Sequence, residues 1–201
     1  MNPSTEADKF SGDTLRRKLP FTTGCLFELA LLILAVLWGL LDDRPVLKEI
    51  HWDLRPAAIG VLAAVTPFLF FMWTLNSRLP LFLRHRDLLE FALRPMFGEW
   101  SILQLLTISI VAGISEEAFF RGAIQGSLAD RVGVIPALVL ASVAFGACHL
   151  LTWTYAIIAA FIGAYLGLLW IWTGNLMTPM ITHALYDFAA LVYFLRMYRS
   201  G

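Results

Sequence analysis

Charged side chains are scarce in this chain of 201 residues, of which 59% are hydrophobic and 15% are Asp, Glu, Lys or Arg. Soluble domains of ordinary composition carry about 25% charged residues, so the scarcity excludes that class. The 15 basic and 15 acidic residues cancel, and no block of like charges occurs. Proteins that bind nucleic acid present clustered basic residues, and we therefore expect no nucleic-acid partner.

Cysteine is also scarce, since the chain contains only Cys25 and Cys148. Both lie in apolar runs and are far apart in the sequence, so no disulfide framework is implied. Cys148 directly precedes His149, but neighbouring residues of a helix point in different directions. A nucleophilic Cys–His pair is therefore not favoured.

Long apolar runs are abundant, and about 20 consecutive apolar residues are enough to span a membrane as a helix. We therefore expect an all-α polytopic membrane helix bundle in which about six helices cross the lipid bilayer. The expected spans are Phe21–Leu41, Pro56–Leu75, Trp100–Phe120, Val134–Leu150, Tyr155–Thr173 and Thr178–Leu195.

The segment 76–99 interleaves basic and apolar side chains and is too polar to cross the bilayer. Helices of this kind lie in the membrane interface, so we expect an interfacial amphipathic helix that forms an elbow before the third span. With a cytoplasmic N-terminus, the inner segments hold ten Lys and Arg residues and the outer segments five, which predicts that both termini are cytoplasmic. Residues 1–20 are then a cytoplasmic tail, residues 21–99 hold two spans and the elbow, and residues 100–201 form a helical core.

Three ionisable residues, Glu116, Glu117 and Arg121, lie at the end of the third span, whose helix is expected to continue to Leu128. Such residues cost on the order of 3 kcal/mol each on insertion scales, and they mark a functional site by default. Glu117 and Arg121 are four residues apart and are expected to pair, whereas Glu116 is turned about 100° away and lacks a local partner. A carboxylate so placed is suited to abstract a proton from water. The alternative is that all three charges form a structural network.

Two further spans carry polar residues, with His149 near the end of the fourth and His183 and Asp187 on one face of the sixth. At 1.5 Å per residue, Glu116 and His149 lie about 21 and 24 Å from the turn between their spans, so we expect them at one depth. His183 and Asp187 lie only about 12 and 18 Å from the turn before the sixth span. Helix tilt or a recessed turn must therefore bring this pair to the others.

The three groups resemble, in order, the motifs of a known protease family. The chain reads Glu-Glu-x-x-x-Arg at 116–121, Phe-x-x-x-His at 145–149 and His-x-x-x-Asp at 183–187. These motifs are similar to those of the CPBP intramembrane proteases, also called the CAAX protease and bacteriocin-processing or Abi family, and the resemblance covers roughly Trp100–Leu195. It implies hydrolysis of a peptide bond within the membrane, and relatives trim C-terminal tripeptides from prenylated proteins. It makes residues 100–201 the catalytic core.

Carried over to this chain, the resemblance gives each residue an expected role. Glu116 is the general base that, with His149, positions and deprotonates the attacking water, and Glu117 and Arg121 form a supporting pair. His183 and Asp187 are expected to stabilise the oxyanion. The well-described prenyl-protein peptidases have asparagine in place of this aspartate. Since an ionised aspartate cannot donate a hydrogen bond, Asp187 must either be protonated or orient His183.

A metal mechanism is the alternative to this glutamic one. His149, His183 and Asp187 are a ligand set that suits Zn²⁺ with one position open for water, and Glu116 would then be the base. The chain lacks the His-Glu-x-x-His spacing of the common zinc peptidases. We therefore favour a mechanism without a cofactor, with zinc as the alternative.

The predicted function is an intramembrane endopeptidase that acts on a membrane-associated protein or peptide, as a multi-pass protein of a bacterial inner membrane. One alternative is a proton- or metal-coupled transporter that uses the same polar residues. Residues 1–100 and 101–201 show no inverted repeat of the kind that such transporters contain. A second alternative is a catalytically idle membrane adaptor. The sequence makes no prediction of oligomeric state.

Overall fold

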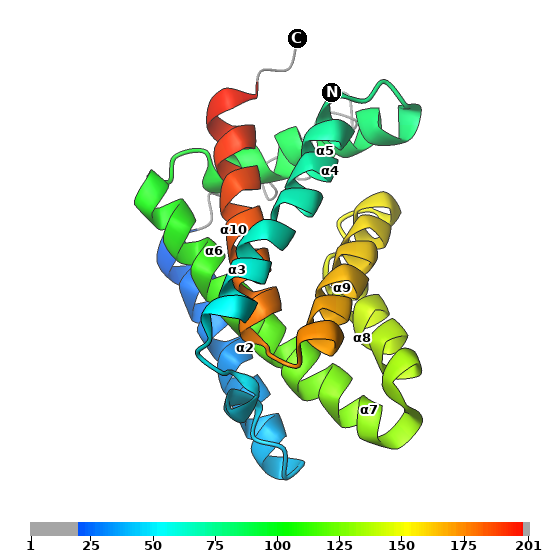
Figure 1. Cartoon of the computed structure of the whole chain (residues 1–201). Helices are drawn as coiled ribbons and strands as arrows, with labels where there is room; N and C mark the ends of the chain where they lie inside the picture. Colours follow the sequence, from blue (N-terminus) through cyan, green and yellow to red (C-terminus); the bar gives the residue numbers. More distant parts are fainter. Residues whose placement is uncertain (1–19, 199–201) are drawn as a thin grey trace, which may run out of the picture.

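The computed structural model describes residues 20–198, and every regular element in that range is helical (Figure 1). The predicted all-α fold is therefore confirmed. The expected cytoplasmic tail, apart from Pro20, lies outside the described residues, and so does the end of the expected core at 199–201.

Within residues 20–198, four helical segments are long and apolar enough to cross a membrane. They are Phe21–Leu41, Leu54–Asn76, Ile102–Val132 and Trp153–Thr173. The first is helix α2 and the last is helix α9. The second comprises α3 (Leu54–Ala63) and α4 (Val65–Asn76), and the third comprises α6 (Ile102–Glu117), the π-helix η2 (Ala118–Gln125) and α7 (Gly126–Val132).

The other two predicted spans form shorter helices. Helix α8 (Val134–Cys148) has 15 residues, and α10 (Met177–Val192) has 16 and continues into a short π-helix, η3 (Tyr193–Met197). Helix α10 begins one residue before the predicted Thr178, because the side chain of Asn175 accepts a hydrogen bond from the Met177 amide at 3.0 Å. All six predicted spans are thus helical. Helix α8 falls below the length of about 20 residues needed to cross the hydrocarbon alone, whereas α10 and η3 together run without a break from Met177 to Met197.

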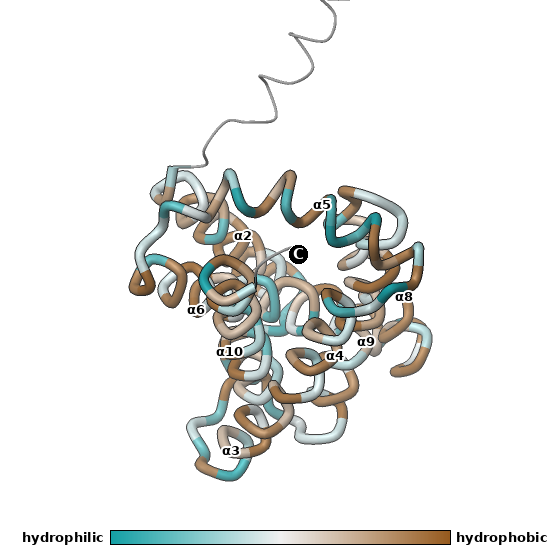
Figure 2. The backbone as a smooth tube through the Cα atoms, turned by 90° about the horizontal axis from the view of Figure 1, so that it is seen from above, coloured by the Kyte–Doolittle hydropathy of each residue, from teal (hydrophilic) through white to brown (hydrophobic). Residues whose placement is uncertain are grey.

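The predicted amphipathic helix forms as α5 (Pro80–Phe97) and runs across one end of the bundle (Figure 1). Hydrophilic and hydrophobic residues alternate along it (Figure 2). Its inward face buries Phe82, His85 and Leu89. Its exposed positions include the polar residues Arg84 and Asp87. Glu90 and Arg94 form an ion pair one turn apart, and Arg94 also donates a hydrogen bond to the carbonyl oxygen of Phe194 at 3.2 Å.

Helix α10 occupies the middle of the bundle, where it packs against α6, α3 and α9, while α2 packs against α6 and the π-helix η2. The approach of α6 to α10 depends on Gly113. A Cβ at this position would lie 2.8 Å from the backbone nitrogen of Ala184 and 2.9 Å from the carbonyl oxygen of Met180. The missing side chain brings the polar residues of the two helices within contact distance.

The outer surface of the bundle is strongly apolar. Leu103, Phe161 and Trp172 expose 71%, 73% and 70% of their surface. Large exposed hydrophobic residues cover the helices on all sides, while Glu117 and Arg121 are buried at 0% and 1%. Such an inside-out distribution of charge fits a protein whose solvent is lipid, and the chain is a membrane protein.

The start of α2 and the end of α10 meet at the end of the bundle that α5 covers. The ring of Phe21 contacts that of Trp100 at 5.2 Å between centroids, and Arg196 donates a hydrogen bond to the carbonyl oxygen of Gly98 at 2.8 Å. The two ends of the described chain therefore lie on the same side of the bundle.

Candidate active site

Glu117 is the hub of a buried polar network at the centre of the bundle. Its Oε1 accepts hydrogen bonds from Arg121 Nη1 at 3.0 Å and from His183 Nδ1 at 2.8 Å. The predicted pairing of Glu117 with Arg121 is confirmed. The bond to His183 was not predicted, and it ties the C-terminal end of α6 to α10.

Arg121 lies in the π-helix η2, which begins directly after Glu117. Its Nη2 donates a hydrogen bond to the carbonyl oxygen of Gly163 at 2.8 Å, and its guanidinium group lies 4.6 Å from the centroid of the Phe145 ring. A Cβ on Gly163 would lie 3.1 Å from Nη2, so the glycine leaves room for this contact. π-Helical turns often occur at functional sites, and here the wide turn carries the cation that binds Glu117.

Glu116 and His149 face one another across a short gap. Glu116 Oε2 lies 3.9 Å from His149 Nε2, which is too long for a direct hydrogen bond. His149 Nδ1 lies 2.8 Å from the carbonyl oxygen of Phe145. Because a carbonyl only accepts, Nδ1 carries the hydrogen, and Nε2 of the neutral ring keeps its lone pair. Glu116 Oε2 is buried and has no hydrogen-bond partner among the described residues, so two acceptors converge on one position.

His183 connects the hub to Asp187. Its Nε2 lies 3.4 Å from Asp187 Oδ2, so each ring nitrogen faces a carboxylate. Counted along the sequence, His183 and Asp187 lay less deep in the bundle than Glu116 and His149. The turn before α10 is recessed relative to the turn after α7 (Figure 1), and this recess makes up the difference. Arg121, Glu117, His183 and Asp187 therefore form a continuous chain of alternating basic and acidic groups.

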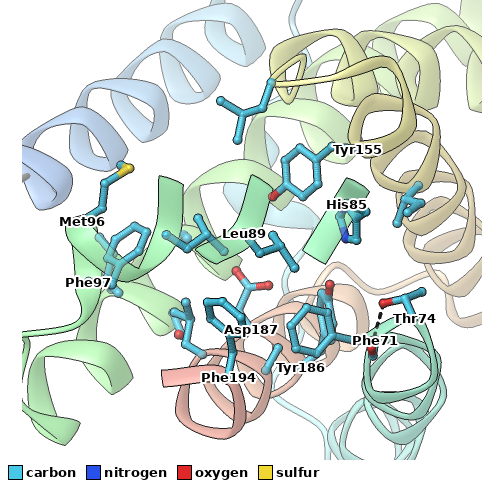
Figure 3. A pocket seen from close by; sticks show the side chains of 18 of the residues that line it. Phe71, Thr74, His85, Leu89, Met96, Phe97, Tyr155, Tyr186, Asp187 and Phe194 are labelled. Carbon is cyan, nitrogen blue, oxygen red and sulfur yellow. Dashed lines mark hydrogen bonds between the residues drawn. The ribbon is translucent and has the colours of Figure 1, made fainter. Parts of the chain in front are cut away.

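A cavity of about 310 Å³ adjoins these residues. Figure 3 shows His85, Tyr155 and Asp187 lining it from α5, α9 and α10. Glu116 also lines it, whereas His149 and His183 are not among the described residues that form its wall. The rest of the wall is mainly apolar. It includes Phe71, Leu89, Met96, Phe97, Ile108 and Phe194, from α4, α5, α6 and η3. The cavity combines a mainly apolar wall with carboxylates.

Among the cavity residues that were not predicted as site residues, Glu28 and His85 carry a carboxyl and an imidazole group. Glu28 of α2 is 8% exposed, lines the cavity and contacts Ser115. It is the one charged residue of the run Phe21–Leu41, and that isolation in a membrane span was the signal for it. His85 of α5 is 3% exposed and stacks on Tyr155 at 5.8 Å. Burial lowers the pKa of His85, because it disfavours the imidazolium form.

The proposed zinc ligands were tested against this geometry. Within residues 20–198, no group of three or more His, Cys, Asp and Glu side chains is placed to hold a metal ion. His183 directs one nitrogen to Glu117 and the other to Asp187. The set of His149, His183 and Asp187 therefore does not fit zinc as the side chains are arranged, and the chemistry below contains no metal step.

Comparisons with known proteins identify a family for the segment that carries the three motifs. Residues 98–189, which contain all three motifs, match the family model described as type II CAAX prenyl endopeptidase Rce1-like. The chain is also 32% identical over 152 residues to YpbD of Bacillus subtilis (strain 168), an uncharacterized protein, with 73% of each chain covered. No solved structure matches the chain.

Proposed function

Because this chain belongs to the Rce1-like family of type II CAAX prenyl endopeptidases, we propose that it is an intramembrane endopeptidase that uses a water molecule activated by glutamate and histidine. Its substrate is a membrane-associated protein or peptide. One observation carries the proposal, namely that the unpartnered Oε2 of Glu116 and the lone pair of His149 Nε2 converge across 3.9 Å. A single water molecule in this gap donates a hydrogen bond to each.

In the proposed reaction, Glu116 takes one proton from the water while the water oxygen attacks the carbonyl carbon. The second hydrogen of the water forms a hydrogen bond to His149 Nε2, which orients the water. Nε2 is free to accept this bond because the hydrogen of the ring is on Nδ1, where it is donated to the carbonyl oxygen of Phe145. Positioned general bases typically contribute a factor of about 10² to 10⁴. The low polarity of the wall excludes bulk water, which strengthens these interactions.

The oxyanion of the tetrahedral intermediate is stabilised by His183 in this proposal. With a carboxylate facing each ring nitrogen, His183 is suited to carry a proton on both. Its contact with Asp187 is 3.4 Å, longer than the usual 2.7 to 3.2 Å for an N–H···O bond, so the Nε2 hydrogen is available to the oxyanion. Asp187 then orients His183, and Glu117 and Arg121 hold it from the other side.

The cavity suits a substrate that carries a lipid chain. Its apolar wall includes the inward face of α5, the helix expected at the membrane interface, and carboxylates lie in the same cavity. A prenyl group on the apolar wall would leave the adjoining peptide bond near Glu116. The family description names prenyl endopeptidases, and we propose the same substrate class here.

The protein is further proposed to reside in a bacterial inner membrane with both termini in the cytoplasm. The two described ends of the chain lie on one side of the bundle, which supports a common location for the termini. Reporter fusions at each end test this, and an external signal from either fusion would reject it.

The function is tested by reconstituting the purified protein in liposomes with a prenylated peptide that ends in a CAAX-type tetrapeptide. Mass spectrometry of the products should show the released C-terminal tripeptide. An intact peptide, together with proton or metal-ion uptake by the same liposomes, would reject the protease and favour the transporter alternative.

A further inference from the structure

Glu28 lies outside the segment 98–189 that matches the family model, and the proposed mechanism does not use it. It is the one charged residue of α2, it is buried, and it lines the same cavity as Glu116. Helix α2 packs against α6 along this stretch. Burying a charged carboxylate in a membrane span is costly when no basic side chain contacts it. The hydrogen-bond partner of the carboxyl group therefore determines its protonation state.

The partner of Glu28 is the hydroxyl of Ser115, the residue before Glu116. Ser115 Oγ lies 2.5 Å from Glu28 Oε2 and 2.8 Å from the carbonyl oxygen of Val111. A hydroxyl has one hydrogen, and a carbonyl oxygen only accepts. Both contacts are satisfied together when Ser115 donates to Val111 and Glu28 carries a proton that it donates to Ser115. The contacts thus favour a neutral carboxylic acid at Glu28.

Glu28 and Glu116 are therefore two carboxyl groups of one cavity in different surroundings. Glu28 has a hydroxyl partner that can accept its hydrogen, whereas Glu116 Oε2 has no partner and faces the acceptor nitrogen of His149. The other charged groups within electrostatic reach of Glu28 are His183 and Asp187 of α10. Pairs of carboxyl groups whose environments differ in this way commonly divide the roles of acid and base.

From this juxtaposition we propose that Glu28 is the general acid of the reaction and protonates the leaving nitrogen of the scissile peptide bond. The proposal rests on the protease function above. Glu116 takes a proton from water as the C–O bond forms. The C–N bond then breaks, its electron pair goes to nitrogen, and the nitrogen takes the proton of Glu28. A proton passes from Glu116 to Glu28 through cavity water to restore the enzyme.

The test compares two substrates that differ in the leaving atom. One is the prenylated peptide, and the other is the same molecule with sulfur in place of the scissile nitrogen. A thiol has a pKa of about 8.5, so it leaves as a thiolate without a proton, whereas an amine leaving group requires one. The variants are Glu28→Gln, which keeps the size of the side chain, Glu116→Gln, and Glu49→Gln as a control in the 3-10 helix η1 (Val46–Glu49) between α2 and α3.

We expect Glu28→Gln to lower kcat on the peptide by about 10²-fold or more and to cleave the thioester at close to the wild-type rate. Glu116→Gln should lose both activities, because both substrates need the activated water, and Glu49→Gln should keep both. Equal losses of Glu28→Gln on both substrates, or full activity on the peptide, would overturn the assignment. If the wild-type protein cleaves neither substrate, the protease function itself fails, and the assignment fails with it.

Discussion

His183 donates its Nδ1 hydrogen to Oε1 of Glu117 at 2.8 Å, and the same oxygen accepts a hydrogen bond from Arg121 at 3.0 Å. One carboxylate therefore holds helix α10 against the π-helical turn that follows α6. All three side chains are at most 5% exposed, so water cannot replace either bond.

Replacing Glu117 by Gln should destabilise the bundle and abolish cleavage, because the change leaves the buried Arg121 without its anion and removes one of the two carboxylates that face His183. Loss of one partner of a buried ion pair costs about 3 to 5 kcal/mol. The free energy of unfolding in mixed micelles measures this. Asp130→Asn is the matched control, since Asp130 is 71% exposed in its pair with Arg44, and exposed pairs contribute about 1 kcal/mol or less. Equal effects of the two changes would contradict a structural role for the hub.

Replacing Gly113 by Ala should separate α6 from α10. The new Cβ would lie 2.8 Å from a backbone atom of Ala184, and backbone cannot move aside as a flexible side chain does. Overpacking of this kind costs about 1 to 3 kcal/mol. The activity should fall by more than the loss of folded protein explains, because the shift also displaces His183 from Glu117. Ile110→Ala on the lipid-facing side of α6, where the side chain is 43% exposed, should keep the activity.

His85 should make the stability of the protein dependent on pH. Burial lowers the pKa of His85 in the folded state, so the unfolded chain takes up a proton first as the pH falls. The contribution to stability is therefore present above about pH 6.5 and is lost as the pH drops below that value. His85→Phe keeps the stacking on Tyr155 and removes the titration. The difference in melting temperature between pH 8 and pH 5 should be smaller in this variant than in the wild type. An unchanged difference would show that His85 does not cause the pH dependence of stability.

Chelation should leave the activity intact, because His183 presents both ring nitrogens to carboxylates. Cleavage of the prenylated peptide is measured after dialysis against a chelator, together with the metal content of the purified protein. Loss of cleavage that returns on addition of zinc would show that His149, His183 and Asp187 rearrange to bind a metal ion.

The contacts that follow from local spacing were predictable from the sequence. Glu117 and Arg121 are four residues apart on one helix, and Glu116 and His149 lie at similar distances along helices that share a turn. Both pairs are brought together as expected. The hydrophobic runs likewise predicted helices at the right places, because apolar length alone determines what can lie in a bilayer.

The contacts that were missed depend on how separate helices pack. The bond between Glu117 and His183 requires the recessed turn before α10 and the close approach at Gly113. The spacing called for helix tilt or a recessed turn without deciding between them, and it did not show which helix packs against Gly113. The segment after Glu117 was expected to be α-helical and forms the π-helix η2. Nothing in its apolar sequence distinguished the two kinds of helix. Glu28 was visible as a lone charge in an apolar run, but its place beside Ser115 required the packing of α2 on α6.

The most direct test of the central claim is the rate at which Glu116→Gln releases the C-terminal tripeptide from the prenylated peptide. Glutamine keeps the shape of the side chain and cannot take a proton from water. If Glu116 is the base, this rate should fall by at least about 10²-fold, with an unchanged melting temperature and with normal activity in Glu49→Gln. Cleavage by Glu116→Gln at the wild-type rate would contradict the proposed mechanism.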